Sequence, residues 1–192
     1  WIKDSKFEEK ILDKTTINDI NNINGDKKPQ NTNDKLLWNT SGKDIVYQGK
    51  INKSLPIKTH IKYYLNDKEL TANEIAGKSG KIKIHISFEN NSKHLANINE
   101  TAKTIYNPFT VATVIAFDNE KFSNIQAENS KIYSDGNSQI LMFVGFPGLK
   151  KSLDLDNSSI EQFKNLNLPD ELTITADVEN FELSPIAIVA SP

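Results

Sequence analysis

Residues 57–90 carry the pattern that most constrains the fold, two alternating runs separated by a short helix signal. Apolar side chains occupy every second position of 57–65 except Thr59, and every second position of 82–88. A period of two is typical of a strand with one buried face. Between the runs, Thr71 and Glu74 have the spacing of a capping box, and Gly77 stands where that helix would end. The second run is therefore predicted to bury Ile82, Ile84, Ile86 and Phe88.

Strand signals continue along most of the chain. From Leu36 onward they recur about every 10–15 residues, as in an all-β sandwich. Residues 134–137, Ser-Asp-Gly-Asn, predict a hairpin turn because glycine tolerates the positive φ that such turns require. We expect strands near residues 36–39, 44–51, 56–66, 80–90, 103–106, 110–117, 122–133, 138–146, 171–179 and 185–190.

Helix is expected only in very short pieces. Besides residues 71–76, the segment 158–166 has Ser158 and Glu161 at capping-box spacing, and Pro169 prevents its continuation. The predicted fold class is therefore all-β, an antiparallel β-sandwich that is Ig-like in general architecture, with one or two very short helices.

The domain organisation is expected to be simple. Residues 1–34 are predicted to form an N-terminal segment that is loosely ordered or packed on the core, with a short helix at 6–12 and an exposed loop at 25–34. Residues 35–192 are predicted to form the β-sandwich unit. The polar stretch 91–102 is an alternative place for a boundary inside that unit.

Composition excludes several classes of function. All 23 basic residues are lysine, and the net charge is −2. The chain therefore has no guanidinium fork for phosphate or guanine and no basic footprint, so we predict no nucleic-acid partner. The absence of cysteine excludes disulfides, thiolate nucleophiles and cysteine-bound metal centres.

The sequence contains no apolar run of the about 18 residues that a membrane span needs. The longest apolar runs, at 111–117 and 140–146, have the length of strands. Because the chain begins with Trp1, we expect it to be a piece of a longer parent protein. Any membrane contact is then expected only through parts of the parent that lie outside this chain.

Three motifs could suggest a metal or a nucleotide. Lysines flank His60 and His85 on their strands, and cationic neighbours disfavour a metal ion; His94 has no partner in sequence. Residues 76–81 resemble a phosphate loop but lack its first glycine, and a strand signal follows them. Residues 154–158 begin like a calcium loop that later lacks its Gly and Glu. We predict no metal and no cofactor, with an irregular calcium site at 154–158 as the open alternative.

Catalytic constellations are missing from the sequence. It contains no Gly-x-Ser-x-Gly elbow, and acids such as Asp177 and Glu179 are scattered over strand exteriors. A cross-link between a lysine and an asparagine would need a buried acid beside them, and both residue types are too abundant to nominate a pair. We therefore predict that the chain is not an enzyme and name no catalytic residue. The alternative to this prediction is an enzyme whose active site is built from Asp, Ser and Lys.

Two interaction surfaces can be proposed from apolar and aromatic residues. The runs 111–117 and 140–146 are apolar throughout, which favours buried central strands or, as the sharper alternative, a partner-binding surface. The residues nominated for that surface are Val114, Ile115, Leu141 and Phe143. Aromatic residues at strand spacing could instead form a sugar-binding platform: Trp38, Tyr47, Tyr63 and Tyr64.

Several segments of the sequence also resemble those of a known protein family. They are Trp38-Asn-Thr-Ser-Gly-Lys-Asp-Ile-Val-Tyr-Gln-Gly49, Tyr63-Tyr-Leu-Asn-Asp-Lys-Glu-Leu70, Ala76-Gly-Lys-Ser-Gly-Lys-Ile-Lys-Ile84, Ile105-Tyr-Asn-Pro-Phe109, Phe146-Pro-Gly-Leu149 with Leu153-Asp-Leu-Asp156, and Ile174-Thr-Ala-Asp-Val-Glu-Asn-Phe-Glu-Leu-Ser-Pro185. From about Trp38 onward the chain is similar to a family of Firmicutes (Clostridium-type) membrane proteins without an established activity. The resemblance implies an extracytoplasmic region that precedes Leu/Gly heptad repeats and a membrane anchor.

The expected function is therefore non-enzymatic. We interpret the chain as an extracytoplasmic β-sandwich domain of a membrane-anchored Gram-positive cell-envelope protein, with a structural or protein-binding role. The alternative is a module that binds carbohydrate, such as cell-wall glycan. The partner is accordingly expected to be an unidentified protein or cell-wall component.

Overall fold

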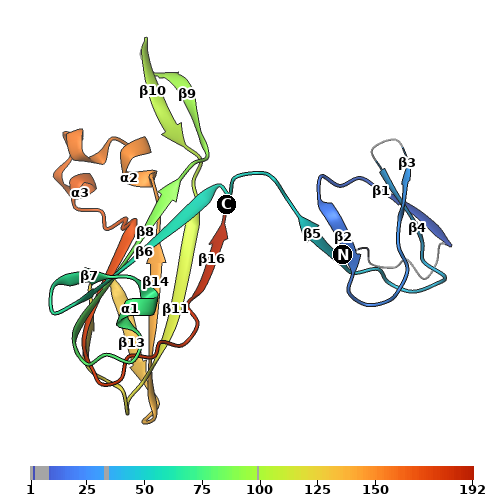
Figure 1. The fold of residues 1–192 in the computed structure, drawn as a ribbon. Helices are drawn as coiled ribbons and strands as arrows, with labels where there is room; N and C mark the ends of the chain where they lie inside the picture. Colours follow the sequence, from blue (N-terminus) through green and yellow to red (C-terminus); the bar gives the residue numbers. More distant parts are fainter. Residues whose placement is uncertain (1, 3–8, 33–34, 99) are drawn as a thin grey trace. The chain divides into compact units, whose positions relative to one another are not determined.

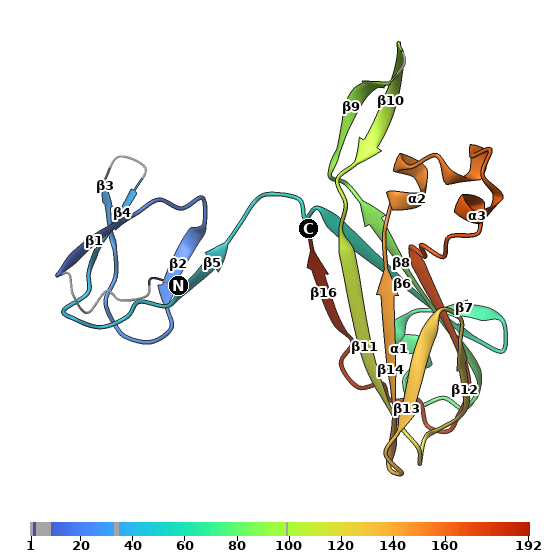
Figure 2. The ribbon, with the colours of Figure 1, turned by 180° about the vertical axis from the view of Figure 1, so that it is seen from behind.

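The computed structural model describes residues 2, 9–32, 35–98 and 100–192, most of which lie in antiparallel strands. The chain divides into two units, Trp1–Ser54 and Leu55–Pro192 (Figures 1 and 2). The unit boundary lies after Ser54 and not after residue 34. The physical reason is strand pairing, because the strands at 35–39 and 47–50 hydrogen-bond to strands that precede residue 34.

Two sheets form the C-terminal unit. The five-stranded sheet has the order β12 (Phe122–Ala127), β15 (Glu171–Val178), β8 (Gly80–Asn90), β6 (Ile57–Leu65) and β7 (Lys68–Leu70). The four-stranded sheet has the order β13 (Ser130–Ser134), β14 (Ser138–Gly145), β11 (Thr110–Asp118) and β16 (Ala187–Ser191). Every pairing in both sheets is antiparallel.

One apolar core joins the inner faces of the two sheets. It includes Ile84 and Ile86 from the five-stranded sheet and Ile115 and Leu141 from the four-stranded sheet, all without solvent exposure. Aromatic rings cross the same space, with the ring centres of Phe88 and Phe143 separated by 6.1 Å. This arrangement confirms the predicted all-β sandwich architecture. The predicted burial of the alternating run in β8 is also confirmed, for Ile82, Ile84, Ile86 and Phe88.

The local signals between β6 and β8 form as predicted. Helix α1 (Ala72–Ile75) begins with a complete capping box, in which Thr71 accepts from the Glu74 backbone and Glu74 accepts from the Thr71 backbone. Gly77 follows the helix with a φ of 73°. The predicted hairpin turn at 134–137 also forms, and it joins β13 to β14 around Gly136, whose φ is 95°.

An extension projects beyond the two sheets. It contains the hairpin β9 (Lys93–Ile98) and β10 (Thr101–Tyr106), and the short helices α2 (Leu149–Ser152), η2 (Leu155–Asn157) and α3 (Glu161–Lys164). The stretch 91–102 therefore contains most of a hairpin within the C-terminal unit and is not a unit boundary. The predicted capping box of Ser158 and Glu161 is wrong: Ile160 precedes the helix, and the Ser158 hydroxyl accepts from the backbone of Ile160.

The N-terminal unit is built from short strands. They are β1 (Lys10–Asp13), β2 (Asn18–Asn22), β3 (Gln30–Thr32), β4 (Lys35–Asn39) and β5 (Tyr47–Lys50), paired in the orders β1-β4-β3 and β2-β5. The helix predicted at 6–12 is wrong where it is described, because residues 10–12 lie in β1; residues 6–8 lie outside the described part. The loop predicted at 25–34 contains β3. The small core consists of Leu36, Trp38 and Ile45.

Candidate functional site

The four residues nominated for a partner surface do not share one surface. Ile115, Leu141 and Phe143 are buried between the sheets, whereas Val114 is half-buried on the opposite side of β11. The nomination of the first three as surface residues is therefore wrong. Although these strands are apolar on both sides, their side chains still alternate between the core and the outer side of the sheet.

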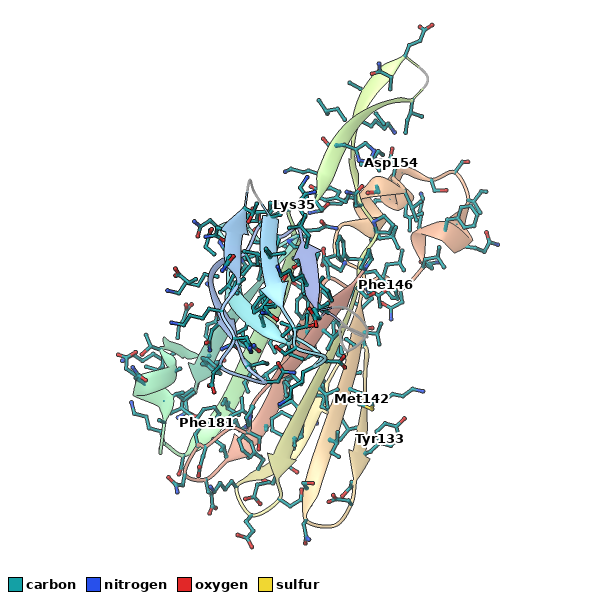
Figure 3. All side chains as sticks on the ribbon, turned by 90° about the vertical axis from the view of Figure 1, so that its right-hand side faces the viewer. Lys35, Tyr133, Met142, Phe146, Asp154 and Phe181 are labelled. Atoms are coloured by element: carbon teal, nitrogen blue, oxygen red, sulfur yellow. The ribbon has the colours of Figure 1, made fainter. Side chains whose placement is uncertain are left out.

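The outer side of the four-stranded sheet is nevertheless apolar. Figure 3 shows Tyr133 and Met142 on this side, and both Met142 and Val144 are 47% exposed. The outward side chains come from all four strands. We call this surface the outer apolar face; its members are Ala112, Val114, Ala116, Tyr133, Ile140, Met142, Val144, Ala187 and Val189.

Strand register makes the outer apolar face continuous. Ala112 lies opposite Val144 on β14 and opposite Val189 on β16. Val114 lies between Met142 and Ala187 in the same way. With strands about 4.8 Å apart and outward residues about 6.8 Å apart along each strand, the nine positions of the face cover roughly 300 Å². A patch of this size is within the range that is often functional on a soluble domain.

The outer side of the other sheet is chemically different. Its exposed positions carry charge, and some of these charges are paired, such as Lys62 with Glu69 at 3.6 Å and His60 with Glu89 at 3.3 Å. Lys83 lies 4.5 Å from the ring centre of Tyr64. The sandwich thus has one charged outer side and one apolar outer side. Water solvates the first without further cost, whereas the second gains free energy when it is covered.

Two of the three histidines, His60 and His85, have carboxylate neighbours that the sequence did not reveal. His85 lies 3.7 Å from Glu171 and 3.1 Å from the Thr173 hydroxyl, both on β15, while Glu89 lies beside His60 on the neighbouring strand. His94 lies on β9 in the hairpin extension. Only cross-strand register reveals these pairs, because the partners are 29 or more residues away in sequence. Among the described residues no three His, Cys, Asp or Glu side chains gather in a way that could hold a metal ion.

The segment that resembles a calcium loop is held by ion pairs. Lys103 donates to Asp154 at 2.6 Å, Asn157 donates to the same carboxylate at 2.7 Å, and Lys150 lies 2.7 Å from Asp156. The hydrogen bond from Lys103 holds the pKa of Asp154 below its usual range. A lysine, a carboxylate and an asparagine thus meet here. However, the carboxylate is 43% exposed and ionised, so it does not supply the buried acid that a Lys–Asn cross-link needs.

The predicted aromatic platform does not form on one surface. Trp38 is fully buried and stacks on Tyr47, with ring centres 5.3 Å apart, inside the core of the N-terminal unit. Tyr63 and Tyr64 belong to the C-terminal unit, where Tyr63 packs edge-on against Phe181. Since Tyr63 and Tyr64 are successive residues of β6, they also face opposite sides of its sheet.

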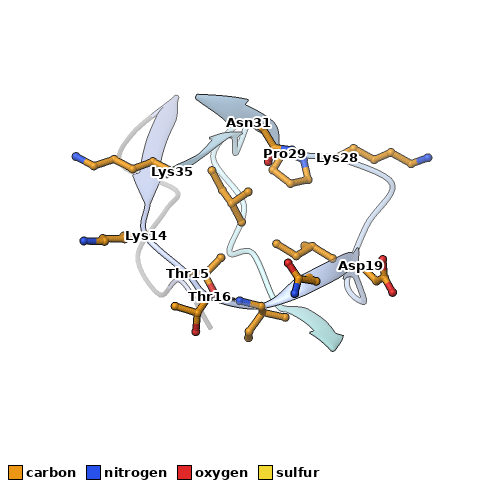
Figure 4. A pocket seen from close by; sticks show the side chains of 12 residues that line it. Lys14, Thr15, Thr16, Asp19, Lys28, Pro29, Asn31 and Lys35 are labelled. Atoms are coloured by element: carbon orange, nitrogen blue, oxygen red, sulfur yellow. Dashed lines mark hydrogen bonds between the residues drawn. The ribbon is translucent and has the colours of Figure 1, made fainter. Parts of the chain in front are cut away.

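A surface hollow of about 820 Å³ lies in the N-terminal unit. It is lined by residues 14–20, 28, 29, 31, 35 and 36. Figure 4 shows the side chains of Lys14, Lys28 and Lys35 extending away from the hollow rather than into it. These three ammonium groups therefore do not converge on the hollow in the way that orients a small ligand.

Comparison with known proteins leaves the chain without an assigned family: no family model matches it, and no curated protein or solved structure does so significantly. Within the described ranges, none of the helices is long and apolar enough to cross a membrane. The geometry of the outer apolar face, described above, makes it the candidate functional site.

Proposed function

We propose that this chain is a non-enzymatic β-sandwich domain that binds a protein through its outer apolar face, as the extracytoplasmic part of a membrane-anchored cell-envelope protein. The observation that carries the binding role is the contrast between the two outer sides of the sandwich. A flat, uncharged row of valine, alanine and methionine side chains gains free energy from contact with another apolar surface.

The chemistry of the face favours a protein over a glycan. Sugars are bound by stacked aromatic rings together with hydrogen-bonding groups that orient the hydroxyls. The outer apolar face carries one aromatic residue, Tyr133, among aliphatic side chains. Its nearest charges are Lys131, which lies on the edge strand β13 directly opposite Met142, and Asp118 at the end of β11. Glycan binding is accordingly the second candidate.

The envelope location rests on the sequence resemblance described above. Under this proposal the domain is displayed outside the membrane, and any anchor belongs to other parts of the parent protein. Fractionation of cells that produce the parent protein tests this part, since the proposal places the domain in a protease-accessible envelope fraction. Recovery only in the protease-protected interior would contradict it.

Site-specific photo-crosslinking in those cells tests the binding role. A benzophenone amino acid at Met142 is expected to give a discrete protein adduct, whereas the same probe at Thr175, exposed on the other sheet, is expected to give none. Val114→Lys, which places a charge beside Met142 in register, should remove the adduct. Equal adducts at both positions, or an adduct that Val114→Lys does not remove, would contradict specific protein binding through the outer apolar face.

A sedimentation experiment separates the glycan alternative. Purified domain is mixed with isolated, protein-free cell walls, and the bound fraction is compared for the natural chain and Val114→Lys. The protein-binding proposal predicts no specific sedimentation of either. Saturable binding to walls, with or without the substitution, would favour the carbohydrate module instead.

A further inference from the structure

The four edge strands of the sandwich differ in how they resist pairing with other chains. Edge strands in natural sheets are usually protected by charge, by a bulge or by shortness. Here β7 has three residues and carries Lys68 and Glu69, β12 has an irregularity between Ser123 and Gln126, and β13 carries Lys131. Strand β16 has none of these features.

The sequence of β16 is Ala-Ile-Val-Ala-Ser, without a charged residue, and its register with β11 is regular over its whole length. Among the strands that the structure describes, β16 pairs with β11 alone, so one row of its backbone N–H and C=O groups faces away from the sheet. Pro185 and Pro192 flank the strand, and proline cannot donate to a ladder. The open edge is therefore limited to the five residues of β16.

We propose that β16 pairs antiparallel with β16 of a second copy, which joins two four-stranded sheets into one of eight strands. The strand that pairs with this edge must be extended and should carry no charge. The β16 strand of a second copy is both extended and uncharged. The longest overlap of the strand with its own copy places Val189 opposite Val189, with Ile188 opposite Ala190. Such self-complementary contacts are the rule for dimers with twofold symmetry.

The alternation of side chains supports this register. Ile188 and Ala190 lie opposite the buried residues Thr113 and Val111, so they belong to the inner side of the sheet. Antiparallel pairing about Val189 brings inner residues next to inner residues and outer residues next to outer residues. No charge is brought against another charge, because β16 has none.

The expected dimer is weak in dilute solution. Five residue pairs bury far less than the about 800 Å² per partner of a standard interface. We therefore expect a dissociation constant on the order of 0.1 mM. Pairing also places two outer apolar faces side by side, and together they cover roughly 600 Å², against about 800 Å² for a standard partner surface. This consequence rests on the proposed function, but the pairing itself does not.

Cysteine scanning tests the pairing directly, because the chain contains no cysteine of its own. Val189→Cys is expected to form a disulfide-linked dimer under mild oxidation. Directly opposed residues of antiparallel strands have Cα atoms about 4.5–5.5 Å apart, a separation that suits a disulfide. Val144→Cys is the matched control, since it lies on the same outer face but on the interior strand β14.

The outcomes separate the possible occupants. Cross-linking at residue 189 at least tenfold faster than at 144, together with a concentration-dependent dimer by sedimentation that Val189→Lys weakens at least tenfold, supports the proposal. Faster cross-linking at 144 would mean face-to-face stacking and would overturn it. A monomer up to millimolar concentration, with equal slow cross-linking at both sites, would also overturn it and leave the edge to a strand from another protein.

Discussion

The two units contain the same kind of secondary structure but very different cores. In the part of the chain that the structure describes, the buried core of the N-terminal unit comprises Leu36, Trp38 and Ile45, whereas that of the C-terminal unit draws on both sheets and includes five phenylalanines. Hydrogen-bonded strand pairs occur in both. Since apolar burial is the main favourable term in folding, ladders alone do not make the units equally stable.

The largest expected effect is that of a substitution in the small core of the N-terminal unit. Trp38→Ala removes the largest side chain of the small core and its stack on Tyr47, a loss of about 3–5 kcal/mol. A small core rarely supplies more than this, so the N-terminal unit should unfold while the C-terminal unit remains folded. A ¹⁵N–¹H NMR spectrum should show collapsed dispersion for residues of β1–β5 only.

Ile84→Ala is the matched substitution in the larger core. It costs about 2–5 kcal/mol, and the many remaining apolar contacts should leave the C-terminal unit folded with a lower melting temperature. If Trp38→Ala instead collapses the NMR signals of both units, the two units unfold as one cooperative body, and their cores do not stabilise them independently.

The same contrast explains what could be predicted from the sequence. In the C-terminal unit, β8 and β11 are 11 and 9 residues long, which is enough for alternation to define the strand and its buried side. In the N-terminal unit, the strands predicted at 36–39 and 44–51 correspond to β4 and β5, whereas β1, β2 and β3 are not predicted. These three strands have only three to five residues, and β2 and β3 consist largely of Asn, Asp and Gln. Their existence depends on pairing with distant segments, which local pattern does not record.

The candidate site was predictable only in part. The apolar runs indicated β11 and β14 as the strands of interest, but the residues nominated were mostly those of the inner side. For a strand that is apolar on both sides, periodicity cannot identify the side that faces the core. The two sides are distinguished by cross-strand register and by the position of the second sheet, neither of which is local.

A second prediction concerns the extension, where a backbone position depends on glycine. Gly148 has a φ of 79°, and a Cβ there would lie 2.7 Å from Cγ of Tyr106 on β10. Gly148→Ala should therefore destabilise the packing of α2 on the hairpin by more than the about 1–2 kcal/mol of left-handed backbone strain. Gly136→Ala is the control, because its φ is 95° but nothing lies within 4 Å of the added Cβ.

Hydrogen exchange measures this difference. Amides of β10 and α2 should exchange faster in Gly148→Ala, while Gly136→Ala should affect only the β13–β14 turn. Equal destabilisation by both substitutions would mean that the contact with Tyr106 has no effect, and that the extension is held by its polar contacts alone.

A smaller effect of opposite sign is expected in the large core. Thr113 is fully buried, and its hydroxyl has no hydrogen-bond partner among the residues that the structure describes. Thr113→Val keeps the shape of the side chain and removes an unsatisfied polar group, so it should stabilise the C-terminal unit by about 1 kcal/mol. Chemical denaturation should show a higher midpoint for that unit. A lower midpoint would imply that the hydroxyl is satisfied in solution, for example by a buried water.

The smallest expected effect is the pH dependence of the extension, which tests whether charge holds one part of the larger unit where apolar burial is slight. Asp154 accepts hydrogen bonds from Lys103 and Asn157, and these hold its pKa below the ordinary 3.8. Its contribution to stability is therefore complete above that ordinary value and is lost as pH falls through the lower folded value. Protection of α2 and η2 amides should decline in this acidic range.

Asp154→Asn should abolish the Asp154 part of that decline. Asp156→Asn removes the same charge from the same turn but keeps the contact between Lys103 and Asp154, so it should retain the decline. If amide protection depends on pH in the same way in both variants, the decline reflects net charge, and no single carboxylate holds this segment against β10.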